Sequence, residues 1–221
     1  MRIRRKKHLK ERLLLVKDYL IVPERDIVNV KEAIKDKKYY DFEKIFNNSN
    51  PIELEIGCGK GGFIVQKAKE NPSINFVAVE MLENIIVMAA ELAQKENLKN
   101  IIFINSGAEY LPRYIRERTV SKIYLNFSPP YPQNGYEERR LTCSTKILAY
   151  KDFLIDGGTV HQKTDDKPFF DYSFEQFTKF GFETKDVSKQ IEDGSIYNVT
   201  TEYEKKFREL GVPICALIAK K

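Results

Sequence analysis

The chain has 221 residues, of which 42% are hydrophobic and 31% are charged, and its formal net charge is +5. This size predicts one well-packed core, and no apolar run approaches the roughly 20 residues of a membrane-spanning helix. Three widely separated cysteines and two histidines argue against a disulfide framework and against a zinc site. The basic N-terminus lacks the apolar segment of a secretory signal, so we expect a cytosolic protein without a metal.

Positive charge is concentrated at the start of the chain. Residues 1–12 hold seven of the 37 basic residues and one of the 32 acidic residues, so the remainder is close to neutral. A basic arm on a near-neutral body is typical of a protein that binds a polyanion such as nucleic acid. The alternative is a solubilising tail.

The elements alternate along the chain. Residues 13–20 have a helical pattern, and no clear domain boundary or repeat follows up to residue 50. Seven strands are then predicted, at 52–56, 75–79, 101–104, 122–126, 159–162, 182–188 and 213–218. Helical patterns occupy 62–70, 84–96, 108–117, 142–153 and 169–180, and residues 156–158 are predicted as a turn into the fifth strand. This order predicts an α/β protein with a mostly parallel sheet and antiparallel pairing of the last two strands at its edge.

Ligands of open parallel sheets bind beyond the carboxyl ends of the strands. The segments that follow the first five strands are 57–61, Glu80, 105–109, 127–136 and 163–166. We therefore expect all five to lie on one rim, which would carry the site.

The glycine-rich loop after the first strand has the spacing Gly57, Gly59, Gly62, which resembles a dinucleotide-binding fingerprint but is weak alone. Glu55 precedes it, and Glu80 follows Gly59 by 21 residues, where a carboxylate can accept hydrogen bonds from a ribose. Carboxylates suit the ammonium and sulfonium of S-adenosylmethionine, whereas they repel the pyrophosphate of a nicotinamide cofactor. S-adenosylmethionine is therefore favoured. The alternative is that Glu55 only faces solvent from an alternating strand.

The loop after the fourth strand contains Pro129, Pro130 and Pro132, which stiffen it and supply no N–H donors. Tyr131 and Tyr136 are suited to stacking on a base lifted from its neighbours. The arginines at 139 and 140 are predicted to meet phosphates. The alternative is an aromatic loop that only packs on the sheet.

Two later segments carry acids. Asp165 is suited either to hydrogen bonds with the Watson–Crick edge of a guanine or to capping a helix that begins near Pro168. Thr201 and Glu204 have the spacing of a capping box, which is the default interpretation of that segment.

Together these motifs resemble the bacterial tRNA (guanine-N7-)-methyltransferases of the TrmB family over nearly the whole chain. The motifs are Glu-Ile-Gly-Cys-Gly-Lys-Gly at 55–61, Glu80, Ile-Tyr-Leu-Asn-Phe-Ser at 123–128, Arg-Arg-Leu-Thr at 139–142, Lys-Thr-Asp at 163–165 and Thr-Glu-Tyr-Glu-Lys-Lys-Phe at 201–207. The resemblance implies a Rossmann-like, seven-stranded methyltransferase domain at 51–221, after a basic arm and helical appendage at 1–50. It implies methyl transfer from S-adenosylmethionine to N7 of guanine 46 in the variable loop of tRNA, by a cytoplasmic monomer or homodimer.

The resemblance also assigns site residues. The residues predicted to bind the cofactor are Glu55, Gly57, Gly59, Glu80 and Gly107. Those predicted to bind the substrate are Tyr131, Gln133, Asp165, Thr201, Glu202, Tyr203 and Glu204.

Three positions depart from the family pattern. Pro129 stands where the acid usually taken as catalytic is expected, Gln133 replaces a lysine, and Gly107 replaces an aspartate, with Glu109 nearby. Guanine N7 has an in-plane lone pair and no proton, so a general base is not obligatory, and orientation can supply up to about 7–11 kcal/mol. Losing one preorganised group costs about 10²–10³-fold by analogy. We expect an enzyme that is active although these positions differ, and the sequence does not identify its catalytic residue. One alternative is a weakened or inactive relative that binds tRNA. The other is a nicotinamide-dependent oxidoreductase.

Overall fold

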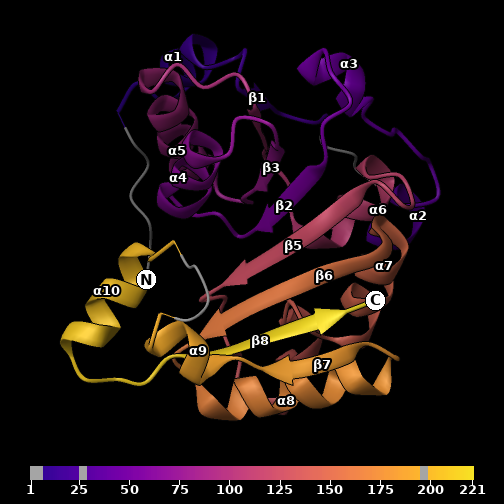
Figure 1. The fold of residues 1–221 in the computed structure, drawn as a ribbon. Coiled ribbons are helices and arrows are strands. Elements are labelled where there is room, and N and C mark those ends of the chain that lie inside the picture. The colour runs from indigo at the N-terminus through magenta and orange to yellow at the C-terminus, as the bar shows by residue number, and fades with distance from the viewer. Residues whose placement is uncertain (1–6, 25–28, 195–198) are drawn as a thin grey trace. The chain divides into compact units, whose positions relative to one another are not determined.

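The computed structural model describes residues 7–24, 29–194 and 199–221, apart from the side chain at position 134. The chain divides into two compact units, Met1–Tyr114 and Ile115–Lys221 (Figure 1). The first six residues of the predicted basic arm lie outside the described residues. The predicted division near residue 50 stays a prediction.

The first unit contains four parallel strands in the order β1-β4-β3-β2. The strands β2 (Ile52–Ile56), β3 (Asn75–Val79) and β4 (Ile101–Ile104) match the predicted ranges, and all their residues are buried. The sequence did not predict β1 (Leu20–Ile21), which pairs with Phe103 and Ile104 of β4. Two residues are too few to show an alternating pattern, and the helix predicted at 13–20, which would include Leu20, lies earlier, as α1 (Leu9–Leu15).

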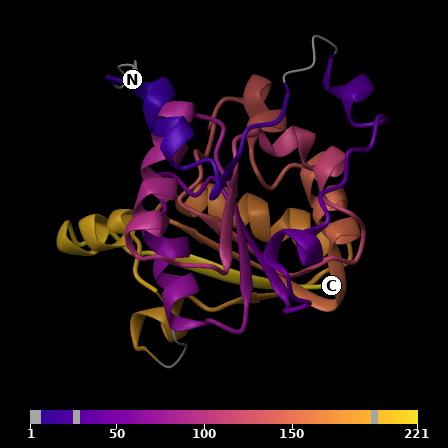
Figure 2. The same cartoon turned by 90° about the horizontal axis from the view of Figure 1, so that it is seen from above.

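Helices cover this unit's strands. The helix α4 (Gly62–Glu70) packs on β3, and α5 (Glu83–Lys95) packs on β4. In both views α1 lies along α5 (Figures 1 and 2), and Arg12 donates hydrogen bonds of 2.6 and 2.5 Å to Glu91. The short helices of this unit are α2 (Val30–Ala33), α3 (Phe42–Phe46), the 3-10 turn η1 (Ala108–Tyr110) and α6 (Leu111–Tyr114). The last two replace a single predicted helix, and Pro112 lies in the first turn of α6, where its missing N–H is tolerated.

The second unit contains four strands in the order β5-β6-β8-β7. The strand β5 (Val120–Asn126) is parallel to β6 (Leu154–Thr164), and β8 (Cys215–Lys220) is antiparallel to both β6 and β7 (Glu183–Asp186). The predicted antiparallel pairing of the last two strands is confirmed. The edge strand is β7, and β8 lies between β6 and β7. The predicted turn at 156–158 is wrong: those residues form a bulge within β6, where the pairing jumps and Gly157 has φ +72°.

The helices of the second unit are η2 (Asn134–Arg139), α7 (Ser144–Phe153), α8 (Lys167–Lys179), α9 (Ser188–Glu192) and α10 (Glu202–Glu209). The helix α8 packs on β6, β7 and β8, and its buried residues include Phe170 and Phe177. Both views show α10 projecting at the carboxyl ends of β5 and β6 (Figures 1 and 2). No helix in the described ranges has the length and apolar character required to cross a bilayer.

Candidate functional site

The carboxyl ends of the first unit's strands lie level with one another. Ile56 pairs with Val79, and Val79 pairs with Ile104, so the segments beginning at Gly57, Glu80 and Asn105 leave the sheet side by side. Asn105 Nδ2 donates to the Glu80 carbonyl oxygen at 2.9 Å. The shared rim is thus confirmed for these three segments.

The glycine-rich loop holds a backbone that side chains would obstruct. Gly57, Gly59 and Gly61 have φ of +82°, +55° and +83°, in the left-handed region that favours glycine. A Cβ at Gly61 would lie 2.7 Å from Ala89 Cβ on α5, whereas a Cβ at Gly59 would meet no atom within 4 Å. The loop therefore packs closely against α5 at Gly61 and leaves open space at Gly59, where a ligand can approach the backbone.

The carboxylates of Glu55 and Glu80 lie near this loop. Glu55 is only 2% exposed, which excludes the alternative that it faces solvent. Glu80 is half-buried, and its Oε1 accepts a hydrogen bond from the Leu82 N–H at 2.9 Å. Burial raises the pKa of the Cys58 thiol well above its ordinary value, and the carboxylates of Glu55 and Glu80 raise this pKa further. Both carboxylates therefore lie near the glycine-rich loop, where they would favour a cationic ligand over an anionic one.

A third acid lies at the end of β4. A Cβ built at Gly107 would lie 2.6–2.7 Å from the carboxyl atoms of Glu109. The Glu109 carboxylate thus occupies the space that a side chain at position 107 would take. Position 107 itself offers only backbone.

S-adenosylmethionine fits these residues by chemistry. Glu55 and Glu80 match its positive charges and its ribose hydroxyls, and the open backbone at Gly59 permits close approach. A pyrophosphate would meet the same two carboxylates unfavourably.

In the second unit, β5 and β6 also end level with each other. Asn126 pairs with Lys163, and the Phe127 N–H donates to the Lys163 carbonyl oxygen at 2.8 Å. The segments 127–136 and 163–166 therefore begin at one edge, as predicted. Phe127 and Tyr131 have φ of +50° and +43°, unusual values for aromatic residues. Ser128 is buried, and its hydroxyl has no hydrogen-bond partner among the described residues.

Asp165 is not the cap of α8. The cap is Asp166, whose Oδ1 accepts a hydrogen bond from the Phe169 N–H at 2.7 Å. The capping alternative for Asp165 is therefore wrong, and Asp165 lies half-buried beside the strand end. Its contact with guanine stays a prediction.

Thr201 caps α10, because its Oγ1 accepts a hydrogen bond from the Glu204 N–H at 2.9 Å. Glu204 is fully buried, and its carboxylate bonds to Lys163 Nζ at 2.7 Å and to Arg208 Nη2 at 3.0 Å. Lys163 Nζ also donates to the Val199 carbonyl oxygen at 3.1 Å. Sequence reasoning missed this ion pair, although a lysine at the end of an apolar strand is a signal that an acid lies nearby. Guanine contacts by Thr201 and Glu204 stay predictions.

The exposed face of α10 carries aromatic rings. Tyr203 is 61% exposed and stacks on Phe127 and Phe207, with ring centroids 6.2 and 6.5 Å away. Glu202 is exposed at the start of the same helix, and Gln133 is exposed at the start of η2. The substrate roles predicted for Glu202, Tyr203, Tyr131 and Gln133 stay predictions.

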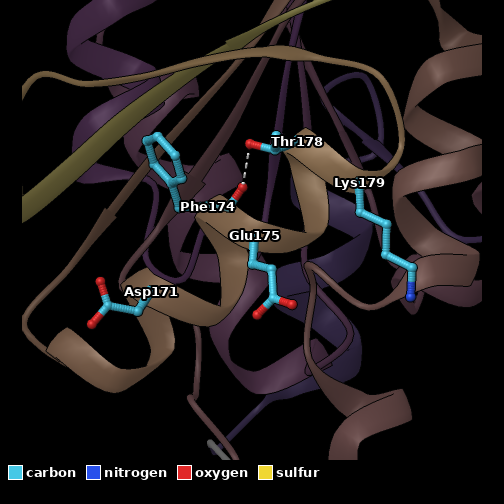
Figure 3. Close-up of a pocket in the computed structure, with 5 residues that line it drawn as sticks. All are labelled: Asp171, Phe174, Glu175, Thr178 and Lys179. Atoms are coloured by element: carbon cyan, nitrogen blue, oxygen red, sulfur yellow. Dashed lines mark hydrogen bonds between the residues drawn. The ribbon is translucent and has the colours of Figure 1, made fainter.

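A hollow of about 460 Å³ lies elsewhere, on the surface of α8 (Figure 3). Every side chain that lines it comes from this one helix: Asp171, Phe174, Glu175, Thr178 and Lys179. None of the predicted site residues takes part in it.

Comparison with known proteins agrees with this geometry. Among solved structures, the 16S rRNA methyltransferase KamB aligns with a TM-score of 0.61 and 14% identity over 83% of this chain and 94% of that one, a likeness of fold. A family model described as a putative methyltransferase matches residues 49–217. The strand order and the glycine loop thus define a protein of the Rossmann-like methyltransferase class.

Curated relatives narrow the class. The tRNA (guanine-N(7)-)-methyltransferase of Clostridioides difficile is 37% identical over 100% of this chain and 99% of its own length. That of Oceanobacillus iheyensis is 41% identical over 79% of this chain and 82% of its own. The chain belongs to the tRNA (guanine-N(7)-)-methyltransferase family.

Proposed function

We propose that the chain transfers a methyl group from S-adenosylmethionine to N7 of guanine in tRNA, at variable-loop position 46, giving 7-methylguanosine. The observation that carries the proposal is the full-length relationship to a protein named for this activity. The glycine loop with the carboxylates of Glu55 and Glu80 supports the choice of cofactor. Because the substrate is tRNA, we also infer a cytoplasmic location.

The first unit supplies the cofactor contacts in this proposal. When bound, S-adenosylmethionine supplies an electrophilic methyl group on a sulfonium. Glu55 and Glu80 would hold its cationic and ribose portions, and the backbone at Gly57, Gly59 and Gly107 would line it. Glu109 would provide the carboxylate that position 107 lacks.

The second unit supplies the acceptor contacts. Asp165, Thr201 and the exposed ring of Tyr203 would hold the guanine, with Tyr131 and Gln133 from the loop after β5 and Glu202 from α10. Guanine N7 carries a lone pair and no proton, so Pro129 need not act as a base. The chain's contribution is orientation, which can lower a barrier by up to about 7–11 kcal/mol.

A methyl-transfer assay tests the proposal. Purified protein with labelled S-adenosylmethionine should label tRNA that lacks 7-methylguanosine, and nucleoside analysis should identify 7-methylguanosine. Absence of label, with cofactor binding intact, contradicts the proposal. A tRNA in which guanine 46 is replaced by adenine serves as the control and should remain unlabelled.

A second candidate function is tRNA binding without catalysis, favoured only by Pro129 and Gln133 at the departures from the family pattern. It predicts salt-sensitive tRNA binding without methyl transfer. A nicotinamide-dependent activity is separated by a thermal-shift comparison: S-adenosylhomocysteine, and not NAD, should raise the melting temperature.

A further inference from the structure

The loop after β5 has few backbone N–H donors of its own. Residues 128–132 include Pro129, Pro130 and Pro132, which have no N–H groups. The carbonyl oxygens of Pro130 and Tyr131 take their donors from outside the segment, and Tyr131 has φ +43°.

One side chain supplies these donors. Arg140 Nε lies 3.1 Å from the Pro130 carbonyl oxygen and 3.2 Å from that of Tyr131, and Arg140 Nη2 donates to the latter at 3.0 Å. A planar guanidinium can reach two adjacent carbonyls at once, whereas a lysine ammonium is a point donor on a flexible stem.

The guanidinium is itself held in place. Arg140 Cζ lies 4.4 Å from the centroid of the Tyr172 ring, and the Tyr172 hydroxyl donates to Glu137 at 2.7 Å. Tyr172 belongs to α8, whose next residue, Ser173, is joined to Thr142 by a buried hydrogen bond of 2.8 Å. The arginine thus connects the proline-rich loop to a helix packed on the sheet.

We propose that Arg140 is a positioning residue that fixes the substrate loop 128–132 for methyl transfer, and that it is not a phosphate contact. This rests on the proposed function, because the loop contains Tyr131 and leads directly into Gln133, both predicted substrate residues. The sequence alone treats Arg139 and Arg140 alike, as phosphate ligands. The structure separates them: Arg140 is half-buried and committed to the loop, whereas Arg139 is exposed over the Tyr136 ring.

The two arginines form a matched pair for the test. We would measure kcat and KM for tRNA over a range of salt concentrations in the unsubstituted chain, Arg140→Lys, Arg140→Ala and Arg139→Ala. Arg140→Lys keeps the charge and removes the fork, so it should lower kcat by about 10²-fold, as expected for a misplacement near 1 Å. Its KM and salt dependence should not change. Arg139→Ala should raise KM and reduce the slope of log affinity against log salt by about 1.

A readout without activity accompanies the kinetics. Hydrogen exchange of the segment 127–136, measured by mass spectrometry, should become faster in Arg140→Lys while S-adenosylhomocysteine affinity and the melting temperature stay near their original values. If Arg140→Ala does not fold, Arg140→Lys and the exchange measurement decide the matter.

The outcomes are distinct. A raised KM and a reduced salt slope in Arg140→Ala, with kcat and exchange unchanged in both Arg140 variants, would overturn the proposal and make Arg140 a phosphate contact. If the unsubstituted chain does not methylate tRNA, the proposed function fails. The exchange measurement then still tests the contact of Arg140 with the loop, and unchanged exchange rejects it.

Discussion

Removing Lys163 should destabilise α10 strongly, because its ammonium is the buried partner of the Glu204 carboxylate. The two side chains are 6% and 0% exposed, and their charged atoms lie 2.7 Å apart. Lys163→Met keeps most of the side-chain volume but leaves the buried Glu204 carboxylate without its ammonium partner. Breaking a buried pair in this way costs about 3–5 kcal/mol.

The structure places the expected loss at the low end of this range. Arg208 also bonds to the Glu204 carboxylate and would remain, although its side chain is 38% exposed and its contribution is therefore screened. We expect Lys163→Met to lower the free energy of unfolding by about 3 kcal/mol. The double variant Lys163→Met, Glu204→Leu removes both buried charges. It leaves the Val199 carbonyl without its donor and leaves Arg208, whose side chain is 38% exposed, without its carboxylate, so it should lose about 1–3 kcal/mol.

Urea unfolding followed by circular dichroism, with amide hydrogen exchange of α10, measures these differences. The matched control is Arg118→Ala, which breaks a surface ion pair with Asp156 whose side chains are 63% and 69% exposed. It should cost no more than about 1 kcal/mol. The reasoning is refuted if Lys163→Met loses no more than the control and exchange in α10 is unaltered.

Three further outcomes follow from the first unit. Gly61→Ala should lower the free energy of unfolding by about 1–3 kcal/mol from backbone strain and further from its contact with Ala89, whereas Gly59→Ala should show the backbone cost alone. Equal losses for the two variants in urea unfolding would contradict this. Glu109→Ala should weaken S-adenosylhomocysteine binding about tenfold, as measured by calorimetry, and adding Gly107→Asp should restore the affinity. An unchanged affinity in Glu109→Ala would show that Glu109 does not contribute to binding. Because the pKa of Cys58 is raised, its thiol should resist iodoacetamide at pH 9 in the native state and react in urea. The stability that this shift contributes is present below the pKa of the unfolded thiol and is lost as the pH rises toward the pKa of the native thiol. If the native protein were labelled as fast as the protein in urea, the prediction that Cys58 is protected would be refuted.

Much of the fold is predictable where burial is complete. The strands β3 and β4 are almost wholly apolar, and β2 alternates apolar residues with Glu53 and Glu55; polar turns bound all three, so their ends coincide with the predicted ones. Local pattern fails where pairing decides the structure. Two residues at β1 form a strand only because an edge of β4 is available, and residues 156–158 remain within β6 because β5 pairs on both sides of the bulge.

The candidate site divides in the same way. Local motifs indicated the glycine loop and its two acids, because the chemistry lies within a few residues. The pairs Lys163 with Glu204 and Arg140 with the loop carbonyls join residues that are 41 and nine or ten positions apart, and no local pattern specifies them. Charge alone could not distinguish a side chain that binds a polyanion from one that holds a loop.

The departures at 129 and 133 are consistent with catalysis when the energies are compared. Losing one preorganised group costs about 2.7–4 kcal/mol, whereas orienting two reactants contributes up to about 7–11 kcal/mol. This chain replaces an acid with a proline in a loop that already has two others, and Arg140 bonds to the carbonyls that the prolines cannot satisfy locally. A lone pair that needs no deprotonation depends mainly on orientation. If Arg140 positions the loop as proposed, orientation of guanine N7 would carry the reaction in this chain without a carboxylate at position 129.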